Sequence, residues 1–244
     1  MKPFPCFILT VILLLSGSKF SLAQQNNPLK KLFEWGIILQ QRGEHLKAVA
    51  LFKKCIEIYP KFAPAFYAMG VSHKELCTDS EEVKKYFDYA VQLNPKYAEA
   101  YDQLGKLEFS LGDFDAAEEN AIKALELKPD LITSKLSLAW IYLLGKSQPE
   151  DAIPLFEDVI KKHAIPYAYY GLGIAYFMDD QRLMVFDMIT KLKGVEHMEW
   201  ANQLESMVRT NRFQGQEVKR GQPLIQPAQR KQSAQQVDNE ASRQ

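Results

Sequence analysis

Small residues recur 34 or 35 positions apart through the middle of the chain, and a large apolar residue precedes each of them. An apolar or aromatic residue usually lies three positions further back, which is the spacing of one helix face. Recurrence at this period predicts stacked structural repeats, each opening with a helix. The five residue pairs are Trp35-Gly36, Met69-Gly70, Leu104-Gly105, Leu138-Ala139 and Leu172-Gly173.

A second apolar stripe, with steps of four and three residues, follows each of the first four marks and indicates a second helix. Proline lacks an amide hydrogen and clashes with the preceding turn, so it ends this helix in the first three repeats. Short turns such as Arg42-Gly43 and Leu111-Gly112-Asp113 make the two helices antiparallel neighbours. The stripes are Ala48, Phe52, Cys55 before Pro60; Val83, Phe87, Ala90 before Pro95; Ala117, Ala121, Ala124 before Pro129; and Ala152, Phe156, Val159.

The pattern resembles the tetratricopeptide repeat family, in the segments FEWGIIL…AVALFKKCIEIYP and YDQLGKLEF…AAEENAIKALELKP. The resemblance implies an all-α fold, a tetratricopeptide-repeat α-solenoid in which antiparallel helix pairs form a right-handed superhelix with a concave groove. It also implies binding rather than catalysis, in a protein of the secreted or periplasmic bacterial type.

This interpretation divides the chain into a signal peptide, a linker, five repeats, a capping helix and a tail. In the fifth repeat Asp179-Asp180 replaces the glycine turn, and Val185, Ile189 and Leu192 form a weaker second stripe. The boundaries are 1–23 for the signal peptide, 24–28 for the linker, 29–62, 63–97, 98–131, 132–165 and the degenerate 166–194 for the repeats, 195–211 for the cap and 212–244 for a disordered Gln-rich tail.

Three local details extend the interpretation. Asp79 with Glu82, and Ser147 with Glu150, are typical of capping boxes at helix starts. Pro154 falls inside the helix that Ser147 would cap, so we expect that helix to kink or to begin later.

The amino terminus indicates secretion. Lys2 precedes an apolar run from Phe7 to Leu15, and Ser21-Leu22-Ala23 suits cleavage after Ala23. An uncleaved anchor is the alternative, although the run is shorter than the roughly 20 residues of a spanning helix. No asparagine has Ser or Thr two positions later, which favours a bacterial periplasmic or secreted location over a glycosylating one.

The charge composition argues against a nucleic-acid partner. The formal net charge is zero and the pI is about 6.9, so nothing indicates binding to nucleic acid.

Cys55 and Cys77 could form a disulfide outside the cytoplasm, but antiparallel packing would place them too far apart, which favours a buried small residue and a separate free thiol.

No motif predicts catalysis. Gly145-Lys146-Ser147 imitates the end of a phosphate-binding loop, but Trp140 stands where the loop needs its first glycine. The four histidines lie in no metal-ligand spacing. We therefore predict no enzyme activity, no catalytic residue, no cofactor and no metal.

Function is expected on the inner face of the first helices, where a partner peptide or helix would bind an apolar and aromatic groove. We call the 14 groove residues the inner stations. Trp140 is the expected hot spot, with Lys74, Asp102 and Lys106 setting the orientation of the partner. The alternative is that these side chains only pack against neighbouring helices. The inner stations are Phe33, Ile37, Tyr67, Val71, Lys74, Asp102, Lys106, Phe109, Leu136, Trp140, Leu143, Tyr170, Ile174 and Phe177.

The sequence thus predicts a non-enzymatic interaction scaffold for a protein or peptide partner in the cell envelope, with a mature chain that does not span the membrane. The competing hypothesis is a structural spacer that forms homo-oligomers through the groove or the cap.

Overall fold

The computed structural model describes residues 28–213 and 216–217, which form two compact units that meet in sequence between Asn94 and Pro95. The expected signal peptide, most of the linker and most of the tail lie outside the described residues. Pro28, assigned to the linker, instead opens the first described helix.

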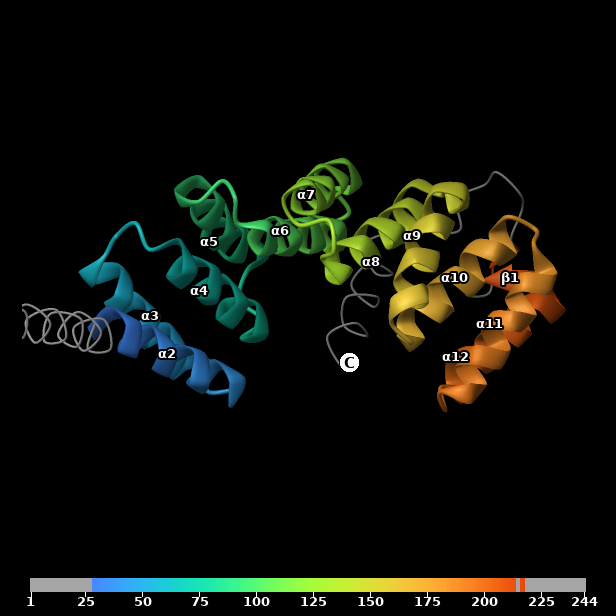
Figure 1. The fold of residues 1–244 in the computed structure, drawn as a ribbon, viewed down its shortest axis with the longest axis horizontal. Coiled ribbons are helices and arrows are strands. Elements are labelled where there is room, and N and C mark those ends of the chain that lie inside the picture. The colour runs from blue at the N-terminus through green and yellow to red at the C-terminus, as the bar shows by residue number, and fades with distance from the viewer. Residues whose placement is uncertain (1–27, 214–215, 218–244) are drawn as a thin grey trace, which may run out of the picture. The chain divides into compact units, whose positions relative to one another are not determined.

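The first unit contains four helices that form two antiparallel pairs (Figure 1). The helix α3 packs against both α2 and α4, so the pairs share one apolar core. Ala48, Phe52 and Cys55 of the predicted second stripe lie fully buried in it. The helices are α2 (Pro28–Gln41), α3 (His45–Ile58), α4 (Ala63–Glu75) and α5 (Ser80–Leu93).

Glycine at the helix crossings allows close packing in this unit. A Cβ atom at Gly70 would lie 2.6 Å from the ring of Phe87, and one at Gly36 would overlap the ring of Phe52. The repeated small residue is therefore paired with the repeated phenylalanine of the second helix. Between α2 and α3, Gly43 takes a left-handed conformation with φ +76° that suits glycine.

The second unit contains seven α-helices, one π-helical segment and two short strands. Its antiparallel pairs follow the predicted order, and α8 with η1 together form the first helix of the fourth repeat. The elements are α6 (Ala98–Leu111), α7 (Phe114–Leu127), α8 (Ile132–Trp140), η1 (Ile141–Lys146), α9 (Pro149–Lys162), α10 (Pro166–Met178), α11 (Arg182–Gly194), α12 (Met198–Thr210), β1 (Arg212–Phe213) and β2 (Gln216–Glu217).

The π-helical segment η1 lies close to the start of α7. A Cβ atom at Gly145 would lie 2.6 Å from the ring of Phe114, so only glycine fits this approach. Ser147 then takes a left-handed conformation with φ +58°, and the amide of Gln148 bonds to the carbonyl of Tyr142 at 2.8 Å. These features end the first helix of the fourth repeat.

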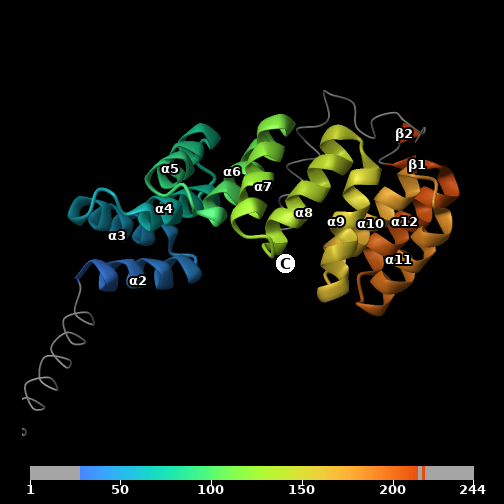
Figure 2. The same cartoon turned by 45° about the horizontal axis from the view of Figure 1, so that its top comes forward.

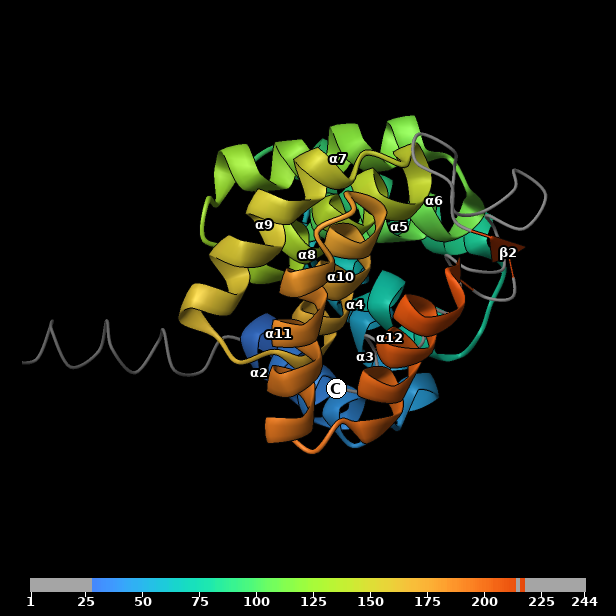
Figure 3. The same cartoon turned by 90° about the vertical axis from the view of Figure 1, so that its right-hand side faces the viewer.

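The helices α11 and α12 occupy the residues assigned to the end of the fifth repeat and to the cap. Val185, Ile189 and Leu192 of α11 are buried, which confirms the weaker stripe. The helices α10, α11 and α12 pack together (Figure 3). A Cβ atom at Gly173 of α10 would overlap the side chain of Leu204 of α12, so the capping helix α12 packs closely against α10 at this glycine.

The beginning of the predicted tail differs from the expectation. Arg212 and Phe213 of β1 pair antiparallel with Glu217 and Gln216 of β2, respectively (Figure 2). Phe213 is buried in the core of the second unit. The strands therefore lie inside the segment that was expected to be disordered, and Phe213 packs into the core because it is an aromatic side chain with apolar surface to bury.

Neither of the two predicted capping boxes forms. Asp79 and Ser147 make no capping hydrogen bond: Asp79 precedes α5 without one, and Gln148 occupies the N-cap of α9. Asp113 does cap α7, since its carboxylate accepts a bond from the amide of Ala116 at 3.2 Å. The helix α9 begins at Pro149 and passes through exposed Pro154, so the expected later start is wrong. Pro154 is the sixth residue of α9, so its missing amide hydrogen costs the helix the hydrogen bond to the carbonyl of Glu150.

Candidate interaction surface

The inner stations of the first unit form a half-buried apolar surface on α2 and α4. Phe33, Ile37, Tyr67 and Val71 each keep part of their side chain accessible, as does Lys74 at the end of α4. The ring of Phe33 lies 5.1 Å from that of Phe62, and the ring of Tyr67 lies 5.9 Å from that of Phe87. These side chains are anchored by aromatic contacts and still present an accessible edge.

Gln40 holds the two helices of this surface together. Its side-chain amide donates to the carbonyl of Ala68 at 2.9 Å and to the hydroxyl of Ser72 at 2.8 Å, both on α4. Gln40 is not among the inner stations, and this role was not predicted from the sequence. The bonds fix α2 against α4, and a surface held rigid before binding loses less conformational entropy when a partner arrives.

The second unit buries most of its inner stations, so the expectation of an open groove is wrong there. Only Lys106, Leu136 and Tyr170 remain half-buried. The six buried stations are Asp102, Phe109, Trp140, Leu143, Ile174 and Phe177.

Trp140 shows why these inner stations are buried. Its indole is 2% exposed and lies edge-on to Phe156 of α9 at 5.5 Å and beside Tyr167 of α10 at 4.8 Å. The helix α8 thus packs on α9 and α10 with the Trp140 indole between them. This agrees with the alternative interpretation, in which these side chains only pack against neighbouring helices. The indole nitrogen is buried without a hydrogen-bond partner, so Trp140 is a core residue and not an exposed hot spot.

A stack of rings continues from this core to the cap. Tyr170 lies 5.3 Å from Trp200 with nearly parallel planes, and Trp200 lies 4.8 Å from His197 in the same way. The hydroxyl of Tyr170 donates to Gln203 of α12 at 2.6 Å. The cap therefore covers the inner face of α10, which explains the burial of Ile174. The cap was predicted from the sequence only as residues 195–211, and the role of Trp200 was not predicted.

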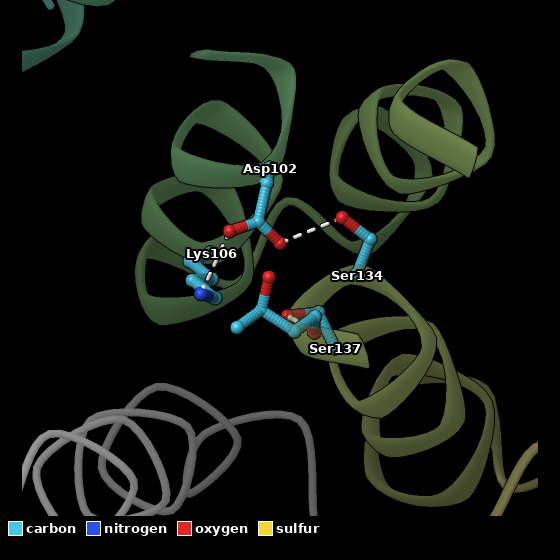
Figure 4. Close-up of polar contacts among 5 residues, drawn as sticks. Asp102, Lys106, Ser134 and Ser137 are labelled. Carbon is cyan, nitrogen blue, oxygen red and sulfur yellow. Dashed lines mark hydrogen bonds and ion pairs between the residues drawn. The ribbon is translucent and has the colours of Figure 1, made fainter. Parts of the chain in front are cut away.

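The expected charged stations of the second unit neutralise each other. Asp102 is 4% exposed and accepts hydrogen bonds from Lys106 on its own helix and from Ser134 of α8, each at 2.8 Å (Figure 4). The neighbouring hydroxyl of Ser137 donates to the carbonyl of Thr133 at 2.9 Å. We call Asp102, Lys106 and Ser134 the polar node. It ties α6 to α8, and its carboxylate is already satisfied.

The segment that imitated a phosphate-binding loop is held by carboxylates. The ammonium group of Lys146 pairs with Asp115 at 2.9 Å and with Glu118. Burial, helped by the Glu118 carboxylate, raises the pKa of Tyr142 to about 12. A lysine that already faces two acids offers no site for phosphate, which agrees with the rejection of that motif.

The described residues contain no group of three or more His, Cys, Asp or Glu side chains that could hold a metal ion. Within them, Cys55 is buried and Cys77 exposed, and both are free thiols, as the packing argument expected. None of the helices in the described ranges is both long enough and apolar enough to cross a membrane.

Comparisons with known proteins agree with the geometry. Tetratricopeptide repeat family models match residues 32–61, 98–131 and 138–183. Heat shock protein STI1 of Saccharomyces cerevisiae is 37% identical over 87 residues, which cover 33% of this chain and 14% of the yeast protein. A peptide N-acetylglucosaminyltransferase of Giardia intestinalis is 29% identical over 97 residues, or 38% of this chain and 6% of the enzyme. This chain thus matches only a small part of these relatives.

Solved structures show the same fold. YrrB, described as a TPR protein with an unusual peptide-binding site, has a TM-score of 0.60 at 19% identity and covers 77% of this chain and 97% of its own. A tetratricopeptide repeat protein of Parabacteroides merdae has a TM-score of 0.58 at 17% identity, covering 91% and 80%. The chain contains tetratricopeptide repeats and has the fold of a tetratricopeptide-repeat α-solenoid, a fold consistent with a protein-interaction scaffold.

Proposed function

We propose that the protein is a non-enzymatic scaffold that binds a peptide segment or helix of a partner protein on the half-buried inner stations of its first unit. The carrying observation is the surface of Phe33, Ile37, Tyr67 and Val71, which joins α2 and α4 and ends at Lys74. Tyrosine is enriched in binding hot spots, and the apolar side chains beside Tyr67 add contact area around it.

The two units differ in a way that supports this assignment. In the second unit most of the corresponding positions pack into the core or, in the polar node, satisfy one another, and only Leu136 and Tyr170 stay half-buried outside the node. An apolar segment that binds the first unit would gain contact area with side chains that already lose little freedom, since Gln40 fixes the two helices. The similarity of fold to YrrB, a TPR protein with an unusual peptide-binding site, is consistent with this use of the surface.

A peptide library displayed on phage tests the proposal when it is selected on the full chain. We expect selected peptides to be rich in apolar residues, and Val71→Asp to weaken their binding at least about tenfold, because an aspartate would be desolvated without a partner. Leu46→Asp on α3 is the matched control, since Leu46 is 73% exposed and is not an inner station. Equal binding by the Val71→Asp chain, with its helical circular dichroism intact, would reject the surface.

We further propose that the partner belongs to the cell envelope and that the chain is exported after cleavage behind Ala23. The basis is the amino-terminal pattern of Lys2, the apolar run and the small-residue triplet. Mass spectrometry of the protein isolated from a bacterial periplasm after expression would show a new amino terminus at Gln24. An intact terminus in the membrane fraction would favour the anchor.

A further inference from the structure

The outer face of α11 carries two exposed apolar side chains. Leu183 is 85% exposed and Phe186 is 51% exposed, and they lie one helical turn apart on the same face. The buried face of α11 is formed by Val185, Ile189 and Leu192, and the two exposed residues lie outside it. We call Leu183 and Phe186 the outer pair.

The second helices of the other repeats differ at these positions, which lie two residues before and one residue after the first member of each buried stripe. In the part of the chain that the structure describes, α11 is the only second helix in which both positions are apolar and exposed. Charge at these positions suits a face in contact with water, so apolar residues there favour a segment that covers them. The equivalents are Leu46 and buried Val49 in α3, Glu81 and Lys84 in α5, Asp115 and Glu118 in α7, and Glu150 and half-buried Ile153 in α9.

The outer pair offers too little apolar surface for a stable contact between separate molecules. A large side chain has an area of about 150–250 Å², so the two exposed fractions correspond to roughly 200–350 Å². A stable protein interface buries about 800 Å² on each partner, more than half of it apolar. A segment of the same chain needs less area, because its effective concentration at the site is in the millimolar range. The area therefore favours a tethered segment over a second copy or another protein.

The described chain ends close to the outer pair. Arg182, the neighbour of Leu183, donates a hydrogen bond from its guanidinium group to the side-chain oxygen of Asn211 at 3.1 Å. Arg212 follows Asn211 and pairs with Glu217 between the two strands. Glu217 is the last described residue, so these links place the end of the described chain roughly 25 Å or less from Leu183.

The segment that follows, residues 218–244, lies outside the described residues and contains one pair of adjacent large apolar residues, Leu224-Ile225. Ile225 is the eighth residue of this segment, and eight extended residues span up to about 26–29 Å. The pair can therefore reach α11. Pro223 and Pro227 flank it, and proline limits the backbone conformations of the free segment, which lowers the entropy lost on binding.

We propose that the outer pair is the docking site of this chain's own residues 221–230, with Leu224 and Ile225 covering Leu183 and Phe186. The contact is apolar and needs no ion pair. It lies on the second unit and is separate from the inner stations, so it adds a second interaction surface to the proposed function. A protein that bound Leu224-Ile225 would first have to displace the segment from α11.

Photocrosslinking within the full chain tests the proposal. With p-benzoylphenylalanine in place of Phe186, ultraviolet light should join the tryptic peptide 183–191, which carries the crosslinker, to the tryptic peptide 221–230. Mixing isotope-labelled and unlabelled chains shows by mass spectrometry whether both peptides come from one chain. We expect the crosslink within one chain, at a yield that does not fall in 1 M salt, because salt screens charges and leaves an apolar contact in place.

Variants of the segment locate the contact. The double change Leu224→Asp with Ile225→Asp should lower the crosslink yield at least about tenfold, because two aspartates would be desolvated against the outer pair. The matched control, Val237→Asp, changes an apolar residue of the same segment outside 221–230 and should leave the yield unchanged. The crosslinker in place of Leu46, which is 73% exposed on α3, should not label the peptide 221–230.

Four results would overturn the proposal. They are a crosslink between chains, which would make a second copy the occupant, no crosslink from position 186 to residues 221–230, an unchanged yield in the double variant, and equal labelling of 221–230 from position 46. None of these results depends on Val71 or on the selected peptides, so the proposed inner-station function would stand or fall separately.

Discussion

Replacing Trp140 by alanine should destabilise the second unit and should not act through partner binding. Full burial of a tryptophan removes about 150–250 Å² from water, worth about 4–6 kcal/mol at 25 cal/mol per Å². The indole nitrogen of Trp140 is buried without a hydrogen-bond partner, and removing such a group relieves a desolvation penalty of about 1–3 kcal/mol. The expected net loss is therefore about 3 kcal/mol, in the lower part of the range for large-to-small core changes.

Urea unfolding followed by far-ultraviolet circular dichroism measures this loss. Trp140→Phe keeps a ring beside Phe156 and Tyr167 and removes the unpartnered N–H group, so its stability should change by less than about 1 kcal/mol. Trp35→Ala is the matched control, because that side chain is 56% exposed and surface changes typically cost about 0.5 kcal/mol or less. An unchanged unfolding midpoint for Trp140→Ala, with weaker partner binding, would refute the core assignment.

Three further changes probe the packing, the polar node and the buried tyrosine. Gly36→Ala should cost about 1–3 kcal/mol in urea unfolding because its Cβ would overlap the Phe52 ring, whereas Gly194→Ala, with no atom within 4 Å, should be close to neutral. Asp102→Ala should cost about 1–3 kcal/mol by leaving its partners unsatisfied, and less in a Ser134→Ala background, as a double-mutant cycle would show. The raised pKa of Tyr142 means that the folded state holds the hydroxyl proton more tightly than the unfolded state, in which the pKa is near 10. The resulting stabilisation is complete below pH 10 and is lost as the pH rises towards 12. The Tyr142→Phe variant should therefore lose less stability than the unchanged chain in an alkaline titration followed by circular dichroism.

The repeat period and the apolar stripes were enough to predict the helix pairs. The reason is visible at Gly70, where the small residue meets Phe87 of the second stripe and only glycine fits. At Gly36, Gly70 and Gly173 the mark in the sequence corresponds to a close contact that a Cβ atom would block. A local pattern repeated five times therefore predicts architecture, because each pair packs on its neighbours in the same way.

The inner stations of the second unit could not be judged from their spacing alone, since spacing gives a helix face but not what covers it. A signal was nevertheless present in α10, whose sequence PYAYYGLGIAYFM contains no charged side chain. A helix that is apolar on all sides is buried on all sides, which would have placed Ile174 and Phe177 in the core. No sequence pattern predicted the π-helical segment η1, because its geometry depends on the close contact between Gly145 and Phe114, which are far apart in the sequence.

The same helix positions thus perform different tasks in the two units, and the chemistry of the residues explains the difference. In α2, Lys30, Lys31 and Glu34 require solvent, so one side of the helix must stay open, and the apolar residues beside them remain partly accessible. In α10 nothing requires solvent, so α12 can cover its inner face and Trp200 can stack on Tyr170. Introducing a lysine at Ile174 would force the cap away from α10, whereas a lysine at Ile37 would only change the charge of an accessible surface. A solenoid of related repeats can therefore keep apolar positions partly accessible in one unit and bury them in another by the placement of a few charged residues.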